Sequence, residues 1–162
     1  MSTTIKEANN VAFTAASTKE RKTIEALLAR VNATDVEHSD VKGYERWDSK
    51  FTINGKKYLC EIKCRNVKHT AYADTLIEVS KVNAMRKLAK EEQRVPLLII
   101  NFTDEVCYVF NLNDDSVRSV KPNKMYCNAT TAVLRDRIEK EVMLLPFRYG
   151  KKIDLTDKID KN

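Results

Sequence analysis

The chain of 162 residues lacks any long hydrophobic segment: its longest apolar run, Val95 to Ile100, is interrupted by Pro96. A helix that crosses a bilayer needs about 20 apolar residues, so this run is too short. Residues 1–16 are polar and rich in Asn, Thr and Ala, unlike the apolar core of a secretory signal. We therefore expect an intracellular, cytoplasmic protein without a membrane partner, placed in the host cytoplasm if it is viral.

Cysteine pairs of the kind that bind zinc are also missing. The four cysteines form no CxxC motif and are not spaced like zinc ligands with His38 or His69. Cys60 and Cys64 would lie about 13 Å apart at strand rise, too far for a disulfide or a shared metal. These cysteines are typical of small buried residues in a reducing compartment.

The sequence has no internal repeat, no low-complexity tract and no alternation of aromatic and basic residues suited to stacking single strands. Its length suits one domain with a real core. We predict a flexible N-terminal tail at 1–16, a single domain at 17–150 and a C-terminal tail or edge extension at 151–162. The net charge of +6 favours an anionic partner.

The clearest local signal is a hairpin at Asn54-Gly55, between two runs rich in β-forming residues. Asn-Gly supplies the two positive φ angles of a type I′ turn. Side chains alternate along the second strand, which puts Glu61 and Lys63 on one face. Asp48 lies far enough before the turn to pair roughly opposite Glu61, within the slack of a bulge or a slipped register. Two carboxylates can then converge on one cation.

That arrangement suits phosphodiester hydrolysis, which needs charge neutralisation and an activated water. Mg²⁺ prefers oxygen ligands, which Asp48, Glu61 and the backbone carbonyl of Ile62 can supply. Lys63 would orient the water or stabilise the developing charge. The alternative is that Glu61 and Lys63 are an ordinary pair on a solvated strand face and that Asp48 is a loop residue.

A helix is expected to begin near Ser17, because Ser17-Thr18-Lys19-Glu20 fits a capping box and apolar residues then recur at helical spacing. Glu20 falls near the centre of the apolar stripe formed by Ile24, Leu27, Leu28 and Val31. Two interpretations of Glu20 remain open. It closes the capping box by reaching back to the Ser17 backbone, or it is a third acidic group that serves the metal.

Further along, the spacing predicts a second helix over 75–92, although Leu76–Val79 could also be extended. Pro96 breaks that helix, and the apolar run 97–102 suits a central strand covered on both faces. A further strand is predicted at 106–110 and a helix at 129–145. This order of elements indicates an α/β fold with a mixed sheet and helices packed against it.

Basic residues follow the strand that carries Glu61 and Lys63 and continue onto the second helix, where they could contact a DNA backbone without reading sequence. Lys81 is expected nearest the metal. For Lys81, Arg86 and Lys87 the alternative is a solvated helical side chain, and for His69 it is a solvated loop histidine. The candidate nucleic-acid-binding residues are Arg65, Lys68, His69, Lys81, Arg86 and Lys87.

Together these residues resemble the PD-(D/E)XK nuclease superfamily, and in particular its archaeal Holliday junction resolvase branch. The likeness runs from about residue 19 to 110 and includes Glu20-Arg21, the run from Asn54 to Cys60, and Val95-Pro96-Leu97. It implies a restriction-endonuclease-like core, an α/β fold with a mixed central sheet flanked by helices.

The resemblance also implies residue roles. Asp48 and Glu61 would be metal ligands, Lys63 the catalytic lysine and Glu20 the accessory acid of the first helix. The cofactor would be Mg²⁺, with Mn²⁺ able to substitute, and the substrate duplex or branched DNA. Because members of this branch generally act as twofold dimers, a homodimer is also compatible with it.

Two functions from different classes follow. One is a metal-dependent DNA endonuclease at 17–150. The other is a catalytically silent nucleic-acid-binding or assembly module on the same fold. The complete set of two acids and a lysine favours the nuclease, because a charge cluster is costly without its cation. A nuclease that acts on RNA is a third, weaker interpretation.

Overall fold

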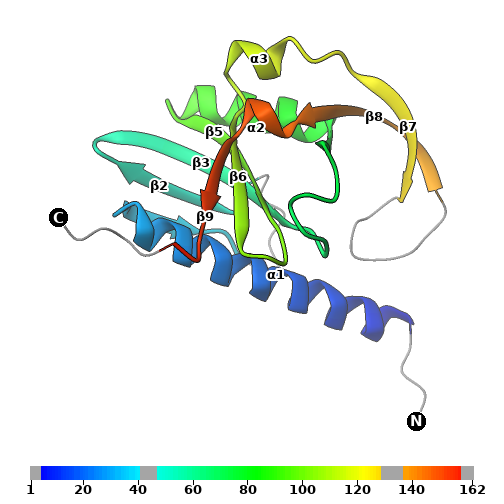
Figure 1. Cartoon of the computed structure of the whole chain (residues 1–162), viewed down its shortest axis with the longest axis horizontal. Helices are drawn as coiled ribbons and strands as arrows, with labels where there is room; N and C mark the ends of the chain where they lie inside the picture. The colour runs from blue at the N-terminus through cyan, green and yellow to red at the C-terminus, as the bar shows by residue number, and fades with distance from the viewer. Residues whose placement is uncertain (1–4, 41–46, 129–136, 158–162) are drawn as a thin grey trace.

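The computed structural model describes residues 5–40, 47–128 and 137–157, and its centre is a mixed β-sheet (Figure 1). The sheet has the strand order β1-β2-β3-β5-β6-β9. β3 and β5 are parallel, and the other neighbours are antiparallel. The bounds are β1 (Thr34–His38), β2 (Ser49–Ile53), β3 (Lys56–Cys64), β5 (Val95–Asn101), β6 (Val106–Asn111) and β9 (Lys151–Asp154).

Helices cover both faces of this sheet. α1 (Ile5–Arg30) packs Ile24, Leu27 and Leu28 against one face, next to Cys60 and Ile62 of β3. On the other face lies α2 (Val79–Glu91), whose buried residues Val82, Met85 and Ala89 join a core with Leu59, Leu98 and Ile100. Figure 1 shows α1 below the sheet and α2 above it. The predicted mixed sheet flanked by helices is therefore confirmed.

A smaller antiparallel sheet lies beside α2. Its order is β4-β8-β7, with β4 (Asp74–Glu78), β8 (Arg137–Pro146) and β7 (Asn123–Asn128). The short helix α3 (Asp115–Arg118) precedes β7, and a 3-10 turn, η1 (Phe147–Tyr149), follows β8. The pairing of β4 with β8 brings residues near 140 next to the start of α2.

The Asn54-Gly55 hairpin forms as predicted. Asn54 has φ 50° and Gly55 has φ 80°, which are the two positive φ angles of a type I′ turn. The turn sets the register, so that Ile53 pairs with Lys56 and Ser49 with Cys60. The apolar run that enters β5 is buried from Pro96 to Asn101, as expected for a strand between two helical layers.

The start of the first helix was predicted wrongly. α1 begins at Ile5, so residues assigned to a flexible tail over 1–16 are helical from that point. No Gly or Pro interrupts the chain between Ile5 and Arg30, and the helix has no reason to start at Ser17. Ser17 is an interior helical residue. The capping-box explanation of Glu20 is thereby excluded.

Two other helix predictions need correction. Residues 74–78 form β4, in line with the extended alternative, and α2 starts only at Val79. Residues 137–146 form β8 rather than a helix, while 129–136 lie outside the described residues. Val142 and Leu145 fit a helical stripe, but pairing with β4 on one side and β7 on the other makes this segment a strand.

At the C-terminal end, β9 adds to the edge of the central sheet by pairing with β6. Within the described part of the chain, no helix combines the length and apolar character needed to span a membrane.

Candidate functional site

The site is organised by alternation along β3. Cys60 and Ile62 are buried against α1, so Glu61 and Lys63 point to the face that carries α2. The side chain of Glu61 is 13% exposed and that of Lys63 is 23% exposed. Glu61 and Lys63 are therefore largely desolvated polar groups inside the fold, whereas the alternative interpretation required a solvated strand face.

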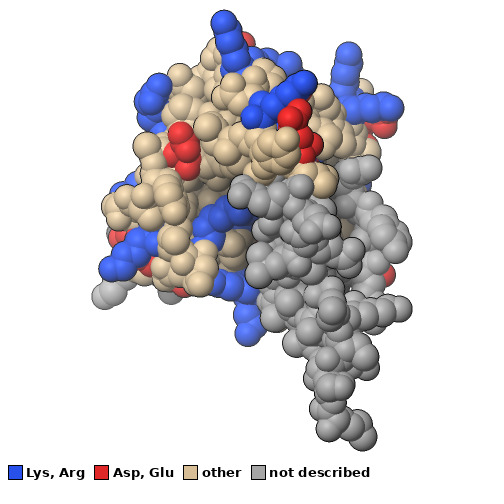
Figure 2. All heavy atoms as spheres, turned by 90° about the vertical axis from the view of Figure 1, so that its right-hand side faces the viewer, with Lys and Arg blue, Asp and Glu red and all other residues tan. Residues whose placement is uncertain are grey.

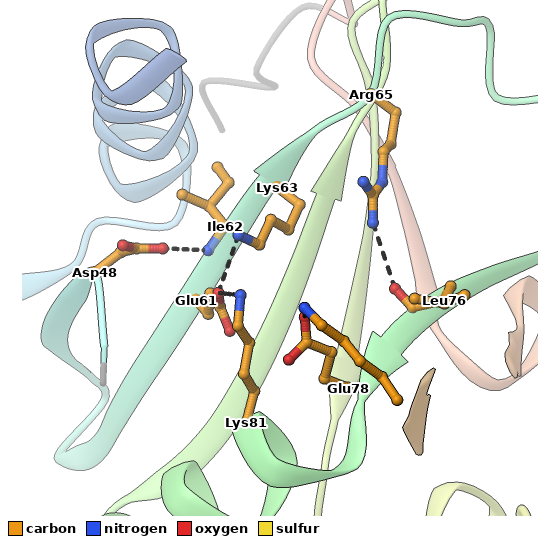
Figure 3. Close-up of polar contacts among 9 residues, drawn as sticks. Asp48, Glu61, Ile62, Lys63, Arg65, Leu76, Glu78 and Lys81 are labelled. Carbon is orange, nitrogen blue, oxygen red and sulfur yellow. Dashed lines mark hydrogen bonds and ion pairs between the residues drawn. The ribbon is translucent and has the colours of Figure 1, made fainter. Parts of the chain in front are cut away.

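Asp48 lies at the edge of β3, directly before β2. Its N–H donates to the carbonyl of Cys60 at 2.8 Å, although Ser49 is the strand partner of Cys60. Asp48 and Ser49 thus both lie opposite Cys60, which is the arrangement of a β-bulge. The bulge turns the Asp48 side chain along β3, and its Oδ2 accepts a hydrogen bond of 2.7 Å from the Ile62 N–H (Figure 3).

That hydrogen bond also orients the backbone of Ile62. The β2–β3 ladder ends at Ser49 and Cys60, so no β2 backbone group pairs with the Ile62 N–H. The N–H and carbonyl of one strand residue point to the same edge. The Ile62 carbonyl is therefore on the Asp48 side of β3, where the sequence placed a third oxygen ligand.

Glu61 is held by two lysines. Its Oε1 lies 3.2 Å from Lys63 Nζ and 3.7 Å from Lys81 Nζ. Lys63 comes from the same strand and Lys81 from the first turn of α2, and both side chains reach toward Glu61 in Figure 3. Lys81, which was expected nearest the metal, thus lies beside Glu61.

Glu20 reaches the same cluster from α1. Burial raises its pKa from 4.5 to about 7, and the charges of Lys63, Asp48, Glu61 and Lys81 all act on it. Asp48 and Glu61 raise this pKa further, while the two lysines lower it. A carboxyl that is half-protonated near neutral pH beside two other acids is a group that an added cation would ionise.

The other pKa values also reflect a crowded, desolvated cluster. Burial raises the pKa of Asp48 although the Ile62 N–H stabilises its charged form. Burial opposes the charge of Lys63, but Glu61 and Glu20 outweigh it and raise its pKa. The pKa of Lys81 is lowered, first by burial and then by the charge of Lys63. Lys63 is thus the more firmly protonated lysine.

The donor set matches a hard divalent cation. Among the described residues, no three His, Cys, Asp or Glu side chains are close enough to hold a metal ion together. The hydrogen bond of Asp48 uses Oδ2 and the ion pairs of Glu61 use Oε1, so Asp48 Oδ1 and Glu61 Oε2 take no part in these contacts. The Ile62 carbonyl adds a third oxygen. Mg²⁺ is bound by one or two carboxylates with retained waters, which these residues fit.

The remaining predicted basic residues divide into two groups. Arg65 and His69 lie just past β3, where Arg65 donates to the Leu76 carbonyl at 3.3 Å and His69 Nδ1 lies 2.6 Å from Asp104 Oδ2. Lys68 is exposed beside them. Arg86 and Lys87 point elsewhere, because they lie five and six residues beyond Lys81 on α2.

Arg86 in particular has a structural partner. Its Nε and Nη2 donate to the Leu112 carbonyl at 2.9 and 2.6 Å. This contact fixes the chain after β6 to α2, away from Glu61. The structure does not bring Arg86 to the acid–lysine cluster.

Two polar pairs near the site were missed by sequence reasoning. Lys140 Nζ of β8 lies 2.7 Å from Glu78 Oε1, next to the start of α2, and the charge of Glu78 acts on Lys81. Asp104 anchors His69 through its side chain and also accepts the His69 N–H at 3.3 Å. Glu78 precedes α2 by one residue, so a correct helix start would have pointed to it. No local signal marks Lys140 or Asp104.

Lysine and arginine side chains are spread over the face shown in Figure 2, with a few acidic side chains among them. This face is the right-hand side of Figure 1.

The fold is similar to a solved structure of Hjc, a Holliday junction resolvase from the archaeal hyperthermophile Archaeoglobus fulgidus. The TM-score is 0.55, and the match covers 83% of this chain and 92% of that chain with 10% identity. No family model and no curated protein matches the sequence. At this identity the likeness establishes the fold alone: an α/β architecture of the restriction-endonuclease-like kind.

Proposed function

We propose that the protein is a Mg²⁺-dependent endonuclease of the PD-(D/E)XK type, which hydrolyses phosphodiester bonds of duplex or branched DNA. The observation that carries the proposal is that Asp48 is hydrogen-bonded to the Ile62 N–H, next to Glu61, which lies 3.2 Å from Lys63, and that the charges of Asp48 and Glu61 act on each other. Mn²⁺ is expected to substitute. The similarity to a Holliday junction resolvase fold supports a branched substrate and a homodimer as the first arrangements to test.

In this proposal Asp48, Glu61 and the Ile62 carbonyl hold the cation. When bound, Mg²⁺ would neutralise charge on the phosphoryl oxygens and lower the pKa of a water molecule. Asp48 is fixed for this task by the Ile62 N–H, so its carboxylate does not have to be ordered when substrate binds. Glu20, from the opposite side of the cluster, supplies a further negative charge once it ionises.

Lys63 acts as a charged donor rather than as a base. Its pKa is raised by Glu61 and Glu20, so its ammonium remains protonated at neutral pH. A protonated lysine beside the scissile phosphate donates hydrogen bonds to phosphoryl oxygens or to the attacking water, and it stabilises the charge that develops in the transition state. Lys81 adds a second positive charge. Arg65, Lys68 and His69 extend the contact to neighbouring phosphates.

A second candidate is a catalytically silent nucleic-acid-binding module. The observation in its favour is that Glu61 Oε1 already lies within 3.7 Å of both lysines, so Glu61 is compensated without a cation. In such a module the acids and lysines would form a structural ion-pair cluster. Cleavage distinguishes the two candidates.

The deciding experiment is to incubate the protein with labelled four-way junction, duplex, flap and single-stranded DNA, with and without Mg²⁺ or Mn²⁺. We expect metal-dependent cleavage that is lost in Lys63→Ala and retained in Lys57→Ala, a matched control at the exposed start of the same strand. Binding of DNA without cleavage under any of these conditions would favour the silent module.

A further inference from the structure

We propose that a cavity next to the acid–lysine cluster receives an unpaired nucleobase, so that the enzyme selects nucleic acid with an unstacked nucleotide beside the cut. This inference rests on the proposed function for the position of the phosphate. The cavity has a volume of about 470 Å³ and is lined by Arg65, Tyr72, Asp74, Thr75, Phe102 and Phe147, among others. This size, with apolar walls and a few polar groups, is typical of sites that bind small molecules.

The cavity adjoins the candidate site through Arg65, which lines the cavity and on which the charges of Glu61 and Glu20 act. Arg65 directly follows the end of β3 and comes two residues after Lys63. Arg65 donates to the Leu76 carbonyl, and Glu78 follows Leu76 by two residues on the same strand. Figure 3 shows Arg65 and Leu76 at one end of the group that includes Glu61 and Lys63.

The cavity has a rigid apolar wall. Phe102 and Phe147 are 3% and 7% exposed, and their rings meet edge to face with centroids 5.4 Å apart. Tyr108 also packs against both rings. Because these rings are fixed by one another, the wall does not have to rearrange to accept a flat ligand.

The opposite side carries an exposed aromatic ring on a tethered loop. Tyr72 lines the cavity and is 67% exposed, so its ring is open to a ligand from solvent. The loop 65–73 is pinned at several points. Thr103 N–H donates to the Val67 carbonyl at 3.0 Å, His69 bonds Asp104, and the Phe147 N–H donates to the Ala73 carbonyl at 3.0 Å. Tyr72 is thereby presented at the cavity by a fixed backbone.

These features fit a nucleobase better than another ligand. An aromatic ring at the mouth provides a stacking surface, and base–aromatic stacking tolerates any base. Asp74 and Thr75 provide groups that can hydrogen-bond a base edge. Arg65 and the exposed Lys68 are positive, as the phosphates on either side of an extruded base require. The His69–Asp104 pair acts in this scheme as an anchor of the loop.

The test uses the full chain with Lys63→Ala, so that DNA is bound without cleavage. Two DNA ligands are compared: a perfect duplex and the same duplex with one unpaired 2-aminopurine. We expect the unpaired ligand to bind more tightly and its fluorescence to be quenched by stacking. Tyr72→Ala should reduce the ratio of the two affinities about tenfold, within the range for a stacked base, and relieve the quenching. Tyr72→Phe should retain both the affinity ratio and the quenching of the wild-type residue, because phenylalanine keeps the aromatic ring. Tyr126→Ala, at another exposed tyrosine on β7, serves as the matched control.

An unchanged affinity ratio and unchanged quenching in Tyr72→Ala would overturn the proposal, as would an equal loss in Tyr126→Ala. These outcomes are separate from failure of the nuclease assignment. If the chain with Lys63 intact cleaves no DNA but quenching still depends on Tyr72, the base site stands and the endonuclease proposal fails. If that chain cleaves DNA and Tyr72→Ala has no effect on the ratio, the endonuclease proposal stands and the base site fails.

Discussion

The carboxylate of Asp48 accepts a hydrogen bond of 2.7 Å from the backbone N–H of Ile62, and this contact replaces a β-ladder bond that β2 does not provide. A residue proposed as a metal ligand therefore also completes the backbone pairing of the strand that carries the other ligand. Its structural and chemical roles can be separated by mutation.

Asp48→Asn keeps an oxygen that can accept the Ile62 N–H but removes the charge. We expect the free energy of unfolding to change little and metal-dependent cleavage to be lost. Asp48→Ala leaves the N–H without this partner, and the free energy of unfolding should fall by about 1–3 kcal/mol. Urea unfolding and a cleavage assay measure the two effects. Wild-type cleavage by Asp48→Asn would show that Asp48 is purely structural.

Lys63→Ala should abolish cleavage and leave DNA affinity nearly intact. One lysine is only one of several phosphate contacts, but loss of a donor to the transition state lowers the rate by about 100-fold or more. Single-turnover cleavage and a binding titration at fixed salt give the two numbers. Undiminished turnover would show that Lys63 has no catalytic role and serves only as an ion-pair partner of Glu61.

Glu20→Gln tests the accessory acid. The uncharged side chain cannot strengthen cation binding, so activity at limiting Mg²⁺ should fall by about tenfold or more and recover partly at high Mg²⁺. The control is Glu91→Gln, an exposed acid on α2. Wild-type activity of Glu20→Gln over a full Mg²⁺ titration would leave Asp48, Glu61 and Lys63 as the whole site.

The same residue should affect stability as a function of pH. The pKa of Glu20 is raised from 4.5 to about 7, so between these values the folded protein keeps a proton that the unfolded chain has lost. The contribution of Glu20 to the free energy of unfolding therefore declines as pH rises from about 4.5 to 7. Without metal, thermal unfolding measured from pH 5 to 8 should show that stability falls more steeply with pH in the wild type than in Glu20→Gln. Parallel curves would contradict the raised pKa.

Arg86→Ala separates a structural arginine from a DNA-binding one. Loss of the two bonds to the Leu112 carbonyl should lower the free energy of unfolding by about 1–3 kcal/mol. The dependence of DNA affinity on salt should remain the same, because no phosphate contact is removed. A shallower salt dependence in Arg86→Ala would restore the role predicted from the sequence.

Short-range patterns were sufficient for the hairpin and for the buried strand β5 beside the site, but not for the starts of α1 and α2. Asn-Gly fixes the hairpin through backbone sterics, and strand alternation then places Glu61 and Lys63 on one face. The apolar run into β5 indicates a strand buried on both sides. These features depend on neighbouring residues alone, so the sequence determined the core of the fold and most of the acid–lysine cluster.

The tertiary structure decided what depends on distant partners. Residues 137–146 have an apolar pattern compatible with a helix, but β4 and β7 provide backbone partners on both sides and make them a strand. In the sequence, Arg86 resembles a solvated helical cation. In the folded chain, the Leu112 carbonyl, just after β6, accepts hydrogen bonds from its guanidinium. The contacts of Lys140 with Glu78 and of His69 with Asp104 join residues 62 and 35 positions apart. Such pairs cannot be predicted from local sequence patterns, because only packing of the whole chain brings their side chains together.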